Sequence, residues 1–181
     1  ALFKTGDVDR GYELMKSIAV TGTIYTEAPG NFPEAMGLKG KGEGQFIFGN
    51  PIGSFLYTLV DGLFGLRLED GGNTLNWSPA FPFEWPEAHL QMPYVEIEYK
   101  STGTPSGKKL EYHAQYSRPR ELTFSTWLKP GTVKEVRVNG ETGKYTLEPG
   151  LNAMKIILEA GPADSHHVEI IFEESRVTVE G

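Results

Sequence analysis

Two hydrophobic patterns divide the chain near residue 66. Before this point apolar residues recur every three or four positions, which is typical of one face of an α-helix. After it they alternate with polar residues, which is typical of a strand that is buried on one side. The patterns predict a mainly β fold: an antiparallel β-sandwich of about eight or nine strands over residues 67–181, preceded by two α-helices and a long glycine-rich loop.

The two predicted helices have clear limits in the sequence. The first is expected after Asp7, a residue type that caps helix N-termini, and its apolar residues follow at helical spacing. The second is expected after Asn50, with Pro51 at its first position and Gly65 at its end. The stretch between them, residues 20–49, holds too many glycines for a regular element.

Turn signals separate the predicted strands. Residues 66–77 are expected to form a hairpin that turns at 70–73, and Asn139-Gly140 indicates a second tight hairpin. The runs 110–116 and 122–128 are expected to be separate strands. Four prolines lie between predicted strands, where turns belong: Pro119, Pro130, Pro149 and Pro162.

The composition of the chain argues against several classes of function. Acidic residues outnumber basic ones by 24 to 17, and the net charge of −7 disfavours binding to nucleic acid or to an anionic membrane. The longest apolar stretches have about 10 residues, roughly half of what a membrane-spanning helix needs. The chain has no cysteine, which excludes disulfides, thiolate nucleophiles and cysteine-based zinc sites.

The second predicted helix raises a packing problem. The apolar stripe over residues 51–64 is so wide that it must be covered. Two helices and a loop cannot cover one another. Either the helices pack on one face of the sandwich, or their partner helices belong to a part of the protein outside this chain.

Four phrases follow one another along residues 22–93: Asn31–Glu34, Gln45–Pro51, Asp61–Leu66 and Leu75–Trp85. Their order and spacing resemble the end of the six-hairpin (α/α)6-barrel glycoside hydrolases, the superfamily of glucoamylase-type and α-L-rhamnosidase-type enzymes. The phrase Val136–Gly140 also resembles a hairpin that is common in the C-terminal sheets of these enzymes.

This resemblance implies an organisation and a function. Residues 1–66 would be the last hairpin of a barrel, residues 67–181 a C-terminal β-sandwich, and residues 67–93 an aromatic, proline-rich joint. The chain would be the C-terminal part of a carbohydrate-active protein, with the remainder of the barrel and a carbohydrate as its partners. The β-domain would brace the barrel, the loop would contribute to the sugar site, and the chain alone would be inactive. The resemblance also suggests a secreted or periplasmic location.

Two acidic residues are candidates for catalysis. Glycoside hydrolysis uses a pair of carboxylates, one to protonate the leaving oxygen and one to activate water. Glu34 is the first candidate, because glucoamylase-type enzymes place their base in a loop shortly before the aromatic start of the last helix. Glu27 is the alternative, because rhamnosidase-type relatives carry a carboxylate in a context similar to Thr23–Glu27. Either residue could instead be an ordinary loop acid, and no second acid can be assigned.

Aromatic residues suggest sugar contacts, because the apolar faces of sugar rings stack on aromatic side chains. Tyr25, Phe32 and Phe48 flank the two acids and are candidates for substrate binding, with a place in a barrel core as the alternative. Trp127 departs from the apolar alternation of its strand and is expected to point outward, as an accessory sugar contact. The aromatic cluster at residues 77–85 is expected to pack in the joint rather than to bind carbohydrate.

No metal or other cofactor is expected. His166 and His167 are neighbours in a predicted strand, so their side chains face opposite ways and cannot bind one ion together. The sequence has no zinc or calcium motif. Residues 40–44 lack the Gly-Lys-Ser/Thr ending of a phosphate-binding loop.

The alternative function belongs to a different class. The chain would be a free-standing, non-catalytic β-sandwich module that binds glycan or protein, with its helices folded back on one sheet. The apolar face of residues 51–64 distinguishes the two interpretations. A covered face favours the free-standing module, and a bare face favours the C-terminal part of a larger protein.

Overall fold

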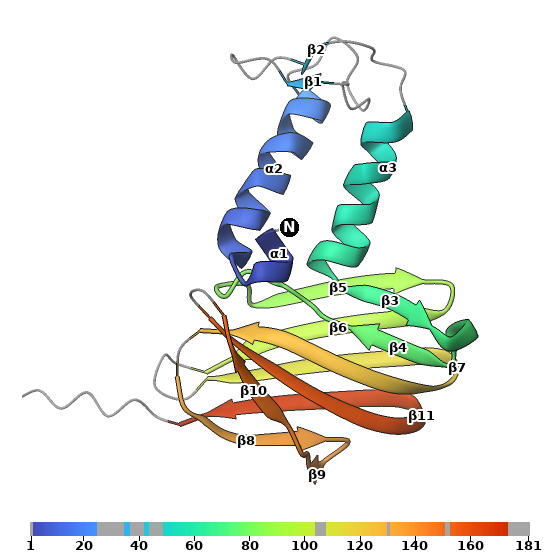
Figure 1. The fold of residues 1–181 in the computed structure, drawn as a ribbon, viewed down its shortest axis with the longest axis vertical. Coiled ribbons are helices and arrows are strands. Elements are labelled where there is room, and N and C mark those ends of the chain that lie inside the picture. Colours follow the sequence, from blue (N-terminus) through green and yellow to red (C-terminus); the bar gives the residue numbers. More distant parts are fainter. Residues whose placement is uncertain are drawn as a thin grey trace, which may run out of the picture.

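The computed structural model describes residues 2–24, 35–36, 42–43, 49–103, 108–129, 131–150 and 153–173 (Figure 1). Among these residues no helix is long and apolar enough to cross a membrane. Two short strands, β1 (Ala35–Met36) and β2 (Gly42–Glu43), pair antiparallel. The helices are α1 (Leu2–Thr5), α2 (Val8–Ile24) and α3 (Gly49–Tyr57), and α3 continues as a π-helical segment over Thr58–Leu63.

The predicted mainly β fold is confirmed from residue 66 onward. One hydrogen-bonded sheet contains β3 (Leu66–Glu69), β4 (Thr74–Trp77), β5 (Glu87–Met92), β6 (Val95–Thr102), β7 (Lys109–Leu128), β8 (Val133–Val138), β9 (Glu141–Thr142), β10 (Thr146–Pro149) and β11 (Met154–Phe172). Both predicted hairpins form, β3–β4 and β8–β9. At the second turn Asn139 and Gly140 have φ of 54° and 84°, as a tight two-residue turn requires.

The long strands β7 and β11 divide the sheet into two layers (Figure 1). The second half of β7 pairs with the first half of β11, with Phe124 opposite Leu158, and β3, β4 and β10 complete this first layer. The first half of β7 pairs with the second half of β11, with Ala114 opposite His166, and β5, β6, β8 and β9 complete the second layer. Both strands bend between the layers, where register shifts interrupt their pairing.

Two details differ from the sequence-based prediction. Residues 110–116 and 122–128 belong to one continuous strand, because Pro119 lies at the bend, where the pairing of β7 with β11 shifts register and a missing N–H is tolerated. In addition, β4 runs parallel to β7, with Trp77 opposite Phe124, so the sheet is mixed rather than wholly antiparallel. Parallel neighbours need a long connection, and β5 and β6 in the second layer provide it.

The core lies between the two layers and reaches the base of the helices. Tyr112 of the second layer contacts Trp77 and Phe124 of the first, with ring centres 5.9 and 5.0 Å apart. Trp77 and Phe124 are fully buried, and each such side chain stabilises the fold by about 1.5–3 kcal/mol. Phe81, which follows β4, extends this core to Phe64 at the end of the π-helical segment, with ring centres 5.2 Å apart.

The helices join the β-domain at one end, and α2 and α3 rise side by side away from it (Figure 1). At this joint the indole N–H of Trp77 donates to the carbonyl oxygen of Phe64 at 3.1 Å. The backbone N–H of Ser78 donates to the carbonyl oxygen of Gly65 at 2.7 Å. The end of the helical segment is therefore fastened to the residues that leave β4.

Substitution of Gly65 by alanine tests how closely the joint is packed, and the same substitution of Gly71 is its control. Their φ angles are 66° and 65°, but a Cβ on Gly65 would lie 2.0 Å from the carbonyl oxygen of Ser78, whereas one on Gly71 would have no atom within 4 Å. Gly65→Ala is expected to lower the free energy of unfolding by about 3 kcal/mol or more, because backbone strain and overlap add. Gly71→Ala is expected to lower it by about 1 kcal/mol. Urea denaturation measures both, and equal losses would contradict the close packing.

Candidate functional site

A polar pocket of about 220 Å³ lies where α1 meets the first layer. Ligand pockets usually have about 300–1,000 Å³, so this one suits a single small group such as one sugar ring. Its polar and aromatic lining comes from α1, the π-helical segment and four strands: Lys4, Asp61, Arg67, Asn76, Ser78, Ser125, Thr126, Trp127 and Lys155.

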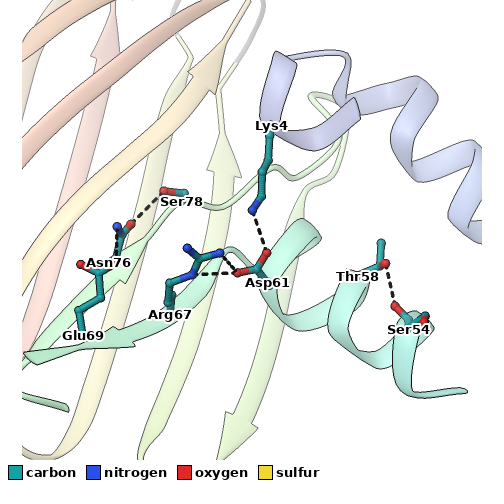
Figure 2. A network of polar contacts seen from close by, with 8 residues as sticks. All are labelled: Lys4, Ser54, Thr58, Asp61, Arg67, Glu69, Asn76 and Ser78. Carbon is teal, nitrogen blue, oxygen red and sulfur yellow. Dashed lines mark hydrogen bonds and ion pairs between the residues drawn. The ribbon is translucent and has the colours of Figure 1, made fainter. Parts of the chain in front are cut away.

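Asp61 is the charged centre of this pocket (Figure 2). Its Oδ1 accepts hydrogen bonds from Nη2 and Nε of Arg67 at 2.7 and 3.2 Å, and its Oδ2 lies 3.1 Å from Nζ of Lys4. The Asp61 side chain is only 11% exposed. Burial opposes its charged form, but the hydrogen bonds from Arg67 and Lys4 outweigh burial and lower the pKa of Asp61 below its usual value. The carboxylate thus links α1 and β3 to the end of the helical segment.

Hydroxyl and amide groups also line the pocket, and Figure 2 shows those of Asn76 and Ser78. The Oγ of Ser78 lies 3.3 Å from Oδ1 of Asn76 and 2.9 Å from Oγ of Ser125. The hydroxyl of Thr126 donates to the carbonyl oxygen of Pro79 at 2.9 Å. Such groups both donate and accept hydrogen bonds, which is the chemistry that sugar hydroxyls require.

Trp127 forms the aromatic side of the pocket. It lies one residue from the inward-facing Thr126 and occupies the outer face of the first layer, as its departure from the apolar alternation predicts. Its indole N–H donates to the carbonyl oxygen of Phe3 at 2.9 Å, and Nζ of Lys155 lies 5.8 Å from its ring centre. Trp127 therefore holds α1 on the sheet, and its accessory contact with sugar stays a prediction.

A second, apolar groove of about 350 Å³ lies between the helices. Its lining includes Leu14 and Ile18 of α2 and Phe55 of α3. Leu14, which lines the groove, is 56% exposed, and Leu56 and Tyr57, which lie outside its lining, are 52% and 61% exposed. The described residues thus cover the helices at their base and leave apolar surface bare farther up.

The remaining sequence-based candidates divide into two groups. The catalytic candidates Glu34 and Glu27 and the aromatic candidates Tyr25, Phe32 and Phe48 lie outside the described residues. The aromatic cluster at 77–85 is described and packs in the joint. Phe81 lies between Trp85 and Tyr99, with ring centres 6.1 and 4.8 Å away.

The sequence analysis did not predict that two histidines lie side by side on the outer face of the sheet. His166 faces the interior, where its Nδ1 lies 2.9 Å from the hydroxyl of Tyr116 and burial lowers its pKa. His167 faces outward, so the predicted opposite orientations are confirmed. Strand pairing also places His113 directly opposite His167 on the outer face of the second layer. Alternation could have identified both as outward-facing, but their pairing depends on register.

Solved structures that resemble the chain distantly include two α-L-rhamnosidases. Neither a protein-family model nor a curated protein matches the chain. An α-L-rhamnosidase from Dictyoglumus thermophilum is 16% identical, with a TM-score of 0.39 over 72% of this chain and 15% of that one. An α-L-rhamnosidase from Streptomyces avermitilis, complexed with L-rhamnose, is 14% identical, with a TM-score of 0.38 over 75% of this chain and 13% of that one. The chain thus spans only a small share of these larger enzymes.

Asp61→Asn tests the charged link at the pocket. Above the unperturbed pKa of 3.8 it is expected to lower the free energy of unfolding by about 1 kcal/mol, because two cations lose their shared carboxylate. Since the pKa of Asp61 is lowered in the folded state, this contribution is lost as the pH falls through that lower value. Urea denaturation between neutral and strongly acidic pH measures the difference.

Glu13→Gln is the matched control for Asp61→Asn. Glu13 is exposed on α2 and lies 3.9 Å from Lys16, so its loss should change stability by less than about 0.5 kcal/mol at every pH. If Asp61→Asn lowers the free energy of unfolding no more than Glu13→Gln does, the charge of Asp61 has no structural role. A loss that persists at acidic pH would contradict that role as well.

Proposed function

We propose that the chain is the C-terminal part of a carbohydrate-active protein of the glycoside hydrolase class. In this proposal residues 1–66 are the last hairpin of a helical barrel, residues 67–181 are its C-terminal β-domain, and residues 67–93 are the joint between them. The β-domain braces the barrel, and the loop before α3 contributes to the sugar site. The observation that carries the proposal is the apolar surface of α2 and α3 that the described residues leave bare.

In the described part of the chain, the contacts of the helices with the β-domain lie at the base of the helices. Phe3, Val8 and Leu63 are buried there, whereas Leu56 and Tyr57 are more than half exposed one or two turns away. Apolar surface of this kind on a rigid scaffold normally marks an interface. Partner helices of a barrel would supply the missing cover, because an apolar helix face packs on other apolar helices.

The carbohydrate class of the proposal comes from the ordered phrases in the sequence. Two of these phrases, Asp61–Leu66 and Leu75–Trp85, form the joint in the structure, since Trp77 bonds to Phe64 and Ser78 bonds to Gly65. Their spacing therefore allows these contacts to hold the β-domain in one orientation against the end of the helical segment, as the proposed organisation requires. The polar pocket beside Trp127 offers groups suited to a sugar ring.

The catalytic part of the proposal assigns one carboxylate to this chain. Glu34 is the first candidate for the base and Glu27 the alternative, both in the segment that connects α2 to α3. Hydrolysis of a glycosidic bond needs two carboxylates on opposite sides of the bond. The second carboxylate would come from the remainder of the barrel, so the chain by itself should be inactive.

An assay of the isolated chain tests whether it holds only one of the two catalytic carboxylates. Incubation with a panel of aryl glycosides, including an α-L-rhamnoside, is expected to release aryl alcohol no faster than buffer does, because a single carboxylate cannot complete the reaction. Turnover at an enzyme-like rate that Glu34→Gln abolishes would contradict the proposal and indicate a complete site within the chain.

Leu56 and Leu63 test whether the apolar face of residues 51–64 is bare. Leu63 is 1% exposed and Leu56 is 52% exposed in the same helical segment. Leu63→Ala is expected to lower the free energy of unfolding by about 3 kcal/mol, and Leu56→Ala by less than about 0.5 kcal/mol, as measured by urea denaturation. Similar losses in both variants would mean that this chain covers that face itself, which would favour the free-standing binding module.

A further inference from the structure

The outer face of the second layer carries a row of side chains that the sequence keeps far apart. His89 on β5 lies opposite Glu98 on β6, Glu98 lies opposite His113 on β7, and His113 lies opposite His167 on β11. Residues that pair directly across neighbouring strands project to the same face of a sheet. The strand neighbours of this row, such as Tyr112, are buried in the core, so the row itself faces outward.

The pair His113 and His167 forms the centre of this row. Their ring centres are 6.1 Å apart and their planes are nearly perpendicular, at 82°. Two imidazoles that bind one ion through nitrogens at about 2.0 Å have ring centres roughly 5–6 Å apart. The ligand atoms that lie within 4.8 Å of one another include those of His167 but not those of His113, so His113 must rotate before both rings can bind a single ion.

Carboxylates surround the two rings. Oε1 of Glu111 lies 3.7 Å from Nε2 of His167, and Glu111, His167 and Glu169 have potential ligand atoms within 4.8 Å of one another. Glu98, Glu111, His113 and His167 line a hollow of about 200 Å³ together with Lys100. This hollow has room for an ion and a bound water.

Two lysines partly balance the negative charge at the hollow. Lys109 forms ion pairs with Glu111, at 3.0 Å, and with Glu169, while Lys100 lies 3.9 Å from Glu98. Each carboxylate has a second oxygen that can still bind a cation. Because Oε1 of Glu111 contacts both Lys109 and His167, a divalent ion must bind through the other oxygen of Glu111 or displace Lys109 from it.

We propose that this hollow is a binding site for a divalent transition metal ion of the Zn²⁺ type. His113 and His167 supply the nitrogen ligands, Glu111 supplies an oxygen ligand, and the fourth position is left to Glu98 or to water. Imidazole with carboxylate suits Zn²⁺ and its neighbours, whereas Ca²⁺ and Mg²⁺ prefer oxygen ligands alone. The site lies on the β-domain and does not depend on the proposed function.

Titration of the full, untagged chain with Zn²⁺ by isothermal calorimetry tests the site. One ion should bind per chain, and His113→Asn and His167→Asn should each weaken binding by about tenfold or more, because each removes a direct ligand. Mg²⁺ and Ca²⁺ at the same concentrations should give no binding heat. Far-UV circular dichroism confirms that each variant is folded, so a loss of binding reports on the ligand set.

His89→Asn is the matched control. His89 lies on the same face outside the hollow, where it forms a separate group with Glu96 and Glu98 whose potential ligand atoms lie within 4.8 Å of one another. His89→Asn therefore distinguishes binding in the hollow from binding at this second group. This substitution should change the Zn²⁺ affinity by less than about twofold. Unchanged affinity in both central variants, an equal loss in His89→Asn, or equal binding of Ca²⁺ would each overturn the proposal.

Discussion

The pairing of β7 with β11 is the constraint on which the rest of the structure depends. These two strands run through both layers, so one continuous ladder forms the centre of each. Their bend folds the sheet onto itself and brings Tyr112 against Phe124, two residues of the same strand. The core between the layers therefore forms as a consequence of one bent pair, and the shorter strands add to its edges.

The joint fixes the helices to the β-domain. Trp77 is buried in the core and also bonds to the carbonyl oxygen of Phe64, so the same side chain belongs to the sheet and to the end of the helical segment. Asp61 and Trp127 add two links to α1 on the outer face. These contacts hold the helices at their base, so the base fixes the direction in which the apolar groove between α2 and α3 faces.

Much of the β-domain could be predicted from the sequence, because burial on one side forces apolar and polar residues to alternate. The same rule predicted that Trp127 faces outward and that His166 and His167 face opposite ways. The continuity of β7 through Pro119 could not be predicted in this way, since proline also ends strands. The parallel pairing of β4 with β7 depends on which segments meet in three dimensions. Glu34 and Glu27 stay predictions, because they lie outside the described residues.

The row of histidines shows why side-chain clusters on a sheet are harder to predict than its core. Alternation fixes the face on which a residue lies, but only register fixes its neighbour. In the first layer Ala160 lies opposite Leu122, and the same register continued would place His167 opposite Gln115. The irregular pairing at the bend moves His167 to a position opposite His113 instead. The two register shifts therefore lie where the strands turn from one layer into the next, and they decide which histidines meet on the outer face.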